Sequence, residues 1–468
     1  MKALLTGLSN KSVSGLMNEL LESLSLRARP RAAKEPTGAL QLQKTIDALL
    51  SRRGEASGVV LASLALDGYE EATADEKTAF LSLLADAYGV DGKAVAAAAQ
   101  AYLDTPDAGA AETLHRVSEP RRREVLRRLN LAPGGTLALV RMREDVMARL
   151  RGAPGLKALD RDFADLFAIW FSRGFLDLRH IDWQTPAAIL EKIIRYEAVH
   201  VIESWDDLRN RLAPSDRRCF AFFHPQLPDE PLIFVEVALT TAIPAAIGPL
   251  LDLERGPIAA EAATTAVFYS ISNTQKGLAG VSFGNFLIKQ VVEDLRHELP
   301  NLKTFVTLSP VPGFAKWLKA EREKGADGLL PEAERTALAG LDAPGWEKDP
   351  AQSEALKAPL LSAAARYFLE AKLPNGRLPD PVGRFHLGNG ARLERLNFLG
   401  DLSAQGLAQS HGLMVNYLYD LGHIETNHEE FVERGVVAAS SEVRKCLKAE
   451  PPPKGGKAAK AVARIAAR

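Results

Sequence analysis

A serine at the end of an apolar run is the first residue of this sequence that suggests chemistry. The stretch TFVTLSPVPGF, residues 304–314, is apolar up to Ser309 and then turns through Pro312 and Gly313. Serine before proline is common in turns, so a purely structural role is the alternative. In an α/β sheet, however, ligands bind beyond the carboxyl ends of the strands. A hydroxyl at this position would be placed to hydrogen-bond a ligand.

A glycine-rich loop precedes this strand in the sequence. SISNTQKGLAGVSFGNFLIKQVVEDL, residues 270–295, places Gly277, Gly280 and Gly284 between a predicted strand and an amphipathic helix. Glycines let backbone N–H groups approach a ligand, and the amino end of a helix favours an anion, so the loop suggests a phosphate or pyrophosphate site. The spacing is neither GxGxxG nor the GK[ST] of a nucleotide-triphosphate loop. Tight packing of the backbone is the alternative explanation of these glycines.

Two later segments contain further candidates. In GRFHLGNGARLERLNFLGD, His386 lies just before a turn, and histidine is the side chain that changes charge near neutral pH. A buried structural histidine is the alternative. QSHGLMVNYLYDLGHI contains His411, Tyr417 and Tyr419 in what is predicted to be a late helix with its apolar side in the core. Neither HExxH nor CxxC occurs, so we expect no metal.

Composition narrows the class of protein. The chain has 468 residues, of which 46% are hydrophobic and 25% charged, and this length favours two domains. With 58 basic and 59 acidic residues, nucleic acid is not an expected partner. The two cysteines do not suggest a disulfide framework. The apolar stretch at the start is too short for a secretory signal, and no apolar run is long enough to span a membrane. We therefore expect a soluble, cytoplasmic protein with no membrane partner.

Sequence patterns divide the chain into three parts. Residues 1–180 are predicted to form a helical domain, in which Thr73 and Glu76 make a capping box. Residues 181–450 alternate apolar, β-branched runs at 218–225, 230–241, 265–272 and 303–310 with helices, which predicts a mixed α/β domain. Residues 451–468 are basic and rich in Pro and Gly, and we expect them to be disordered. The predicted fold class is α+β multidomain.

From about residue 183 to 420, the sequence resembles the malonyl-CoA decarboxylase family. The likeness is carried, in order, by WQTPAAILEKI, YEAVHVIESWDDL, RRCFAFFHP, EPLIFVEVAL, SISNTQKGLAGVSFGNFLIKQVV, TLSPVPGFAKWL, FHLGNGARLERLNFLGD and GLMVNYLYD. The resemblance implies a helical amino-terminal domain that forms a homo-oligomer, a dimer or tetramer. It also implies a catalytic domain with the fold of the GNAT acetyltransferases.

The resemblance also assigns roles to residues. It implies catalytic roles for Ser309, His386 and Tyr419. It implies binding of the substrate or its CoA part by Ser270, Gln275, Lys276, Gly277, Leu278, Ala279 and Gly280. Two positions depart from the pattern: Thr274 stands where acetyltransferases have Arg or Gln, and Ser282 stands where animal members are expected to have an acidic residue.

The activity implied is that of a carboxy-lyase of fatty acid metabolism, which converts malonyl-CoA to acetyl-CoA and CO2. No separate cofactor is expected, because the thioester itself accepts the electrons of the breaking bond. Ser309 and His386 would position the malonyl carboxylate and protonate the enolate. Two alternatives remain at this point. An acyl-CoA acyltransferase would consume an amine acceptor, and a non-catalytic acyl-CoA sensor would bind CoA without releasing CO2.

Overall fold

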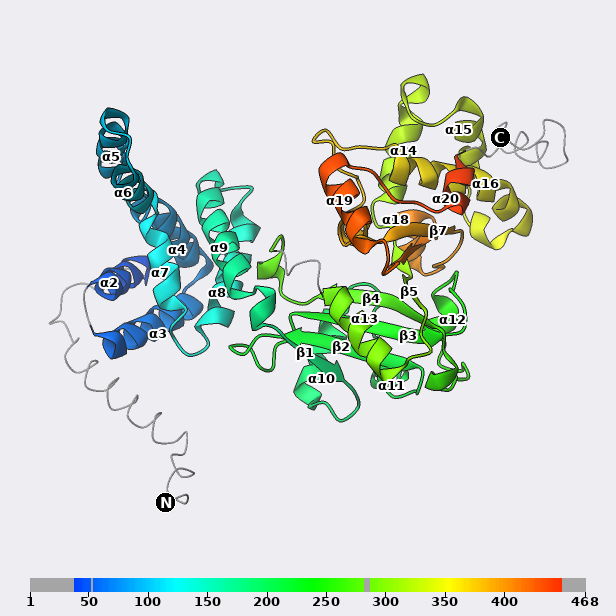
Figure 1. Cartoon of the computed structure of the whole chain (residues 1–468), viewed down its shortest axis with the longest axis horizontal. Coiled ribbons are helices and arrows are strands. Elements are labelled where there is room, and N and C mark those ends of the chain that lie inside the picture. Colours follow the sequence, from blue (N-terminus) through cyan, green and yellow to red (C-terminus); the bar gives the residue numbers. More distant parts are fainter. Residues whose placement is uncertain (1–37, 52–53, 282–286, 448–468) are drawn as a thin grey trace, which may run out of the picture. The chain divides into compact units, whose positions relative to one another are not determined.

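The structure is a computed structural model that describes residues 38–51, 54–281 and 287–447 (Figure 1). The expected disordered tail, Gly284 and Ser282 lie outside these residues. The chain forms two compact units, one of Met1–Phe171 with Gln275–Val281 and one of Ser172–Thr274 with Ser282–Arg468. The division therefore falls a few residues before the expected boundary at residue 180, and the segment Gln275–Val281, with Gly277 and Gly280 of the glycine loop, belongs to the first unit.

The first unit is helical, as the sequence predicts. The predicted capping box at the start of α4 is confirmed: the Thr73 side chain accepts from the N–H of Glu76, and the Glu76 side chain accepts from the N–H of Thr73. Its helices are α2 (Gly38–Leu50), α3 (Glu55–Glu71), α4 (Ala74–Ala87), α5 (Gly92–Asp104), α6 (Ala108–Ser118), α7 (Arg121–Leu129), α8 (Gly135–Arg149) and α9 (Lys157–Trp170). A buried ion pair between Arg122 of α7 and Asp162 of α9, 2.5 Å long, joins two of them.

The second unit is built on one mixed sheet. The strand order is β1-β2-β3-β4-β5-β8-β6, and β7 pairs with β8. All pairs are antiparallel except β4 with β5. The strands are β1 (Asp177–Ile181), β2 (Arg217–Phe223), β3 (Ile233–Thr240), β4 (Thr265–Asn273), β5 (Thr304–Thr307), β6 (Ser309–Pro310), β7 (Arg392–Asn397) and β8 (Met414–Leu418). The four predicted strand regions are confirmed: they correspond to β2, β3, β4 and, for the last region, the consecutive strands β5 and β6.

Three strands were not predicted: β1, β7 and β8. β1 begins at Asp177, within the first 180 residues, which were expected to be all helical. It was missed because it is a short edge strand with only Ile181 buried, so it lacks an apolar alternation. The prediction of a late helix over residues 414–418 is wrong, because these residues form β8. The helix α18 (Ala404–Ser410) ends before them, where His411 and Gly412 adopt positive φ values of 54° and 78°.

Helices cover the sheet and join its strands. They are α10 (Ala187–Tyr196), α11 (Trp205–Leu212), α12 (Gly248–Leu251), α13 (Leu287–Glu298), α14 (Phe314–Glu323), α15 (Glu332–Leu338), α16 (Pro350–Leu369), α17 (Pro381–Gly388), α18, α19 (Ile424–Arg434) and α20 (Ser441–Cys446). Within the described residues, no helix is both long and apolar enough to cross a membrane. The fold is thus a helical region followed by a mixed sheet domain, as predicted.

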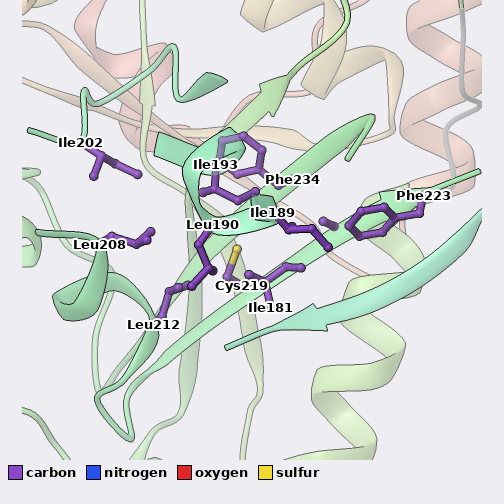
Figure 2. Close-up of a cluster of buried hydrophobic side chains, with 11 residues drawn as sticks. Ile181, Ile189, Leu190, Ile193, Ile202, Leu208, Leu212, Cys219, Phe223 and Phe234 are labelled. Carbon is purple, nitrogen blue, oxygen red and sulfur yellow. The ribbon is translucent and has the colours of Figure 1, made fainter. Parts of the chain in front are cut away.

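Two apolar clusters pack against the sheet. The first lies at β1–β3 with α10 and α11, and Figure 2 shows Ile193, Cys219 and Phe234 among its side chains. Each fully buried aliphatic or aromatic side chain of this kind contributes about 1.5–3 kcal/mol. The second lies along β3, β4, β5 and β8 and includes Val267, Val306 and Leu308. Because side chains alternate along a strand, the residues next to Val306 and Leu308 point to the opposite face.

Candidate active site

The site forms where two neighbouring strands stop pairing. The last residues that pair in parallel between β4 and β5 are Phe268 and Thr307. The N–H of Leu308, the next residue after β5, still donates to the carbonyl of Phe268 over 3.0 Å. β4 continues beyond this point to Asn273, whereas Ser309 pairs with Val415 of β8 instead. Ser309 was predicted to lie at the carboxyl end of an apolar strand. It also lies just beyond the point at which β4 and β5 stop pairing.

Four polar side chains meet at this point, and we call them the hydroxyl–imidazole chain: Thr307, Ser309, His386 and Tyr419. The Ser309 hydroxyl donates to Thr307 Oγ1 over 2.9 Å and lies 3.3 Å from His386 Nε2. On the other side of the ring, His386 Nδ1 lies 2.8 Å from the Tyr419 hydroxyl. All four residues are at most 5% exposed. The structure thus brings the three predicted catalytic residues together in one hydrogen-bonded group.

The short helix α17 positions His386. Asp380 caps its amino end, where the carboxylate accepts from the N–H of Gly383 over 2.6 Å, and Pro381 occupies the first helical position. His386 lies in the last turn of this helix. Its imidazole stacks on the ring of Tyr417 in β8, with centroids 4.7 Å apart and an interplanar angle of 25°. The cap fixes the helix and the stacking fixes the ring plane.

Burial sets the charge of the site. Desolvation lowers the pKa of His386 from 6.5 to about 3, so the imidazole is neutral at neutral pH. Desolvation also raises the pKa of Tyr419 well above its ordinary value, so this hydroxyl stays protonated. A neutral imidazole has one N–H donor and one acceptor nitrogen. The hydroxyl–imidazole chain is therefore an uncharged set of donors and acceptors in the ligand-free protein.

Ser270 is hydrogen-bonded to a different group. A register shift between β3 and β4 places it opposite Glu236, and its hydroxyl donates to Glu197 Oε2 over 2.7 Å. The other Glu197 oxygen accepts from the N–H groups of Val199 and His200, both at 2.8 Å. Within the described part of the chain, no hydrogen bond joins Ser270 to the hydroxyl–imidazole chain. Its hydroxyl instead holds the segment after α10.

The glycine loop packs on helix α8 of the helical unit. The N–H of Gly277 donates to Glu144 over 3.2 Å, and its carbonyl accepts from Arg143 over 2.8 Å. A Cβ at position 277 would lie only 2.0 Å from the carbonyl oxygen of Val140, so only glycine fits there. Two further loop N–H groups, those of Leu278 and Ala279, donate to carbonyls within the loop. Close packing therefore accounts for Gly277, as the alternative explanation allows.

Comparison with known proteins identifies the family. Sequence models of the malonyl-CoA decarboxylase N-terminal and C-terminal domains match residues 88–171 and 174–456. The chain belongs to the malonyl-CoA decarboxylase family. It is similar to the mitochondrial malonyl-CoA decarboxylase of Rattus norvegicus, with 33% identity over 92% of this chain and 91% of the relative. The mitochondrial malonyl-CoA decarboxylase of Anser anser anser is 38% identical over 69% of each chain.

Solved structures extend this likeness to the fold of a malonyl-CoA decarboxylase. The crystal structure of malonyl-CoA decarboxylase from Rhodopseudomonas palustris is 63% identical, with a TM-score of 0.84, and the match covers 88% of this chain and 100% of that one. The enzyme from Agrobacterium vitis is 56% identical with a TM-score of 0.83, over 87% of this chain and 99% of that one. The family and its fold therefore apply to both units of the chain.

Sequence patterns did not single out Thr307, and they placed Tyr417 in a predicted helix with its apolar side in the core. Thr307 accepts the Ser309 proton, and Tyr417 supplies the ring beneath His386. The signal for Thr307 was its spacing, because residues two apart on a strand share a face. For Tyr417 the prediction of a helix hid the alternation of β8. Among the described residues, no cluster of three or more His, Cys, Asp or Glu residues could hold a metal ion.

The packing of Gly277 predicts a stability effect. Gly277→Ala forces α8 or the loop to move, because the new methyl group meets the backbone of Val140. Overpacking of this kind costs about 1–3 kcal/mol of unfolding free energy. Thermal and denaturant unfolding measure it, with Gly155→Ala as the control, since nothing lies within 4 Å of a Cβ at that position. Unchanged stability of Gly277→Ala would contradict the packing role.

Proposed function

We propose that this chain decarboxylates malonyl-CoA to acetyl-CoA and CO2 at the hydroxyl–imidazole chain. The observation that carries the proposal is the buried contact between Ser309 and His386, 3.3 Å apart, in a member of the malonyl-CoA decarboxylase family. These two residues supply a hydroxyl and a titratable ring at one point. Both are needed for a reaction that must hold one carboxylate and deliver one proton.

The chemistry requires little beyond positioning. Malonyl-CoA loses CO2 when its carboxylate turns out of the thioester plane, so that the breaking C–C bond overlaps the carbonyl π system. The electron pair of that bond moves into the thioester, which becomes an enolate. A proton then adds to the carbon that carried the carboxylate. Malonyl-CoA in its carboxylate form plus one proton thus gives acetyl-CoA and CO2, and interactions that strengthen in the transition state raise the rate.

Ser309 and His386 take separate parts in this scheme. The Ser309 hydroxyl donates to the malonyl carboxylate and holds it in the twisted pose. His386 supplies the proton to the enolate carbon, with Tyr419 as the hydrogen-bond partner that orients the ring. The LSPVP segment lacks the G-x-S-x-G elbow of a hydrolase, so no acyl-enzyme step on Ser309 is proposed.

The incoming substrate supports protonation of His386. Without ligand, burial holds its pKa at about 3. A carboxylate placed beside the ring favours the imidazolium, so substrate binding raises the pKa of His386. The proton consumed in each turnover would therefore be taken up with the substrate and lost to carbon. Acetyl-CoA has no carboxylate, so the imidazole returns to its neutral form.

Binding of the CoA part remains a separate proposal. We assign it to Ser270 and to the loop residues Gln275, Lys276, Gly277, Leu278, Ala279 and Gly280, as the family resemblance implies. The exposed Lys276 is the cation of this loop, and its ammonium suits a phosphate. The N–H groups of Gly277, Leu278 and Ala279 already donate within the protein, so the Lys276 side chain is the main phosphate contact proposed.

The central prediction concerns two substitutions. Ser309→Ala should lower kcat at least about tenfold, because it removes the carboxylate donor. His386→Asn should lower kcat about 10²-fold or more, since Asn keeps a polar side chain but cannot supply the proton. The assay supplies malonyl-CoA alone and measures the release of acetyl-CoA and CO2. His297→Asn, at an exposed position of α13 in the same unit, is the control.

Three outcomes would oppose the proposal in different ways. Binding of malonyl-CoA without CO2 release would favour a sensor, and a requirement for an amine acceptor would favour an acyltransferase. If both variants kept a kcat within a few-fold of the wild-type value, the chemistry would have to take place elsewhere in the protein. Retained CoA affinity in His386→Asn separates loss of chemistry from loss of binding.

We further propose that the chain forms a homo-oligomer, a dimer or tetramer, through its helical unit. Support comes from α5, where Leu103 is 71% exposed, and from α6, which buries none of its residues. Leu103→Lys should reduce the mass of the full chain measured by sedimentation, because a charge is costly at an apolar contact. Leu253→Lys, at an exposed position of the sheet unit, is the control. A monomeric wild-type chain would contradict this proposal.

We also propose a cytoplasmic location for the chain. Both cysteines, Cys219 and Cys446, are free thiols, as in a reducing compartment. The curated relatives from goose and rat are named as mitochondrial. Cell fractionation followed by detection of the chain distinguishes the two locations.

A further inference from the structure

We propose that Thr307 is a positioning residue that fixes the proton of the neutral His386 ring on Nε2. The imidazole then presents an N–H to Ser309 and an unprotonated Nδ1 to Tyr419. The proposal about the ring proton rests on contacts alone. Its consequence for turnover rests, in addition, on the proposed decarboxylase function.

Thr307 is placed to do this by its strand. It is the last residue of β5, has no exposed surface, and shares a face with Ser309 two residues later. Its hydroxyl oxygen accepts from the Ser309 hydroxyl over 2.9 Å and from the N–H of Tyr417 over 3.1 Å. The Asn416 side chain donates to the Thr307 carbonyl over 2.8 Å, which ties β5 to β8 at this residue.

The direction of the chain follows from counting protons. A serine hydroxyl has one proton, and the Ser309 proton points to Thr307, so only lone pairs of Ser309 Oγ face the ring. Nε2, 3.3 Å away, must therefore be the donor in that contact. A neutral imidazole has a single N–H, so Nδ1 is the acceptor and the Tyr419 hydroxyl donates to it over 2.8 Å. Tyr419 thus donates to His386, His386 donates to Ser309, and Ser309 donates to Thr307.

Removing the threonine hydroxyl should reverse this order. In Thr307→Val the Ser309 proton loses its acceptor, and His386 Nε2 is the ring nitrogen within reach. Ser309 then donates to Nε2, the ring proton moves to Nδ1, and Tyr419 becomes the acceptor. The partner of one ring nitrogen thus determines which nitrogen carries the proton. Val keeps the β-branched shape of Thr, which suits a strand, whereas Ser keeps the hydroxyl.

The test is a ¹⁵N NMR measurement of the histidine rings in the full chain, labelled with ¹⁵N-histidine, at pH 7.5 without ligand. The His386 signals are those that disappear in His386→Asn. We expect the Nε2–H tautomer in the wild type and in Thr307→Ser, and the Nδ1–H tautomer in Thr307→Val. An Nδ1–H wild type, or the same tautomer in wild type and Thr307→Val, would overturn the proposal. Should Thr307→Val not fold, Thr307→Ala takes its place, and the wild-type spectrum still decides.

Turnover provides a second, independent measurement. Thr307→Val should lower kcat about tenfold with a smaller effect on KM, while Thr307→Ser should stay within a few-fold of wild type. In a Ser309→Ala background Thr307→Val should have almost no further effect, because the hydroxyl through which it acts is gone. An equal loss in both backgrounds would mean that Thr307 is merely structural. A wild-type chain without decarboxylase activity would refute the proposed function and leave the NMR result standing.

Discussion

The pairing of β8 with both β5 and β6 is the constraint on which the site depends. Val306 of β5 pairs with Leu418, and Ser309 of β6 pairs with Val415, so one strand bridges the break at Leu308. This pairing brings Thr307 and Ser309 next to Tyr417 and Tyr419, although more than 100 residues separate the two segments in the sequence. If β8 shifted its register by one residue, both tyrosines would change faces and the ring of His386 would lose its support.

Desolvation then determines what the assembled groups can do. Leaving a buried donor or acceptor unpaired costs about 1–3 kcal/mol, so the hydroxyls and ring nitrogens of the chain are matched to one another. The matching is possible only with a neutral ring, since an imidazolium would need two acceptors at once. A substrate carboxylate changes that balance, because it supplies both an acceptor and a negative charge. The same burial that keeps His386 neutral in the free protein therefore makes its protonation responsive to the substrate.

Much of this structure could be predicted from the sequence. The features that could not be predicted are mainly contacts between residues far apart in the sequence. The strands β2–β5 follow from local apolar runs, and the capping box at Thr73 from four residues. Ser309, His386 and Tyr419 were assigned by family resemblance, and the structure brings them into contact. Local patterns could not show that Gly277 faces the backbone of Val140, about 140 residues earlier, or that Ser270 donates to Glu197. β8 was taken for a helix because its five residues, four of them apolar, are too few to distinguish the helical period from the strand period.

The dependence of kcat on pH tests most directly whether His386 becomes protonated when the substrate binds and then donates that proton. The working form is the imidazolium, which is complete below the pKa of His386 in the complex and is lost as pH rises through that pKa. Between pH 6.5 and 8.5, wild-type kcat should therefore fall as pH rises, by up to about tenfold per pH unit, and His386→Asn should lack this slope. A wild-type kcat that is independent of pH across this range, or an equal slope in His386→Asn, would contradict the mechanism.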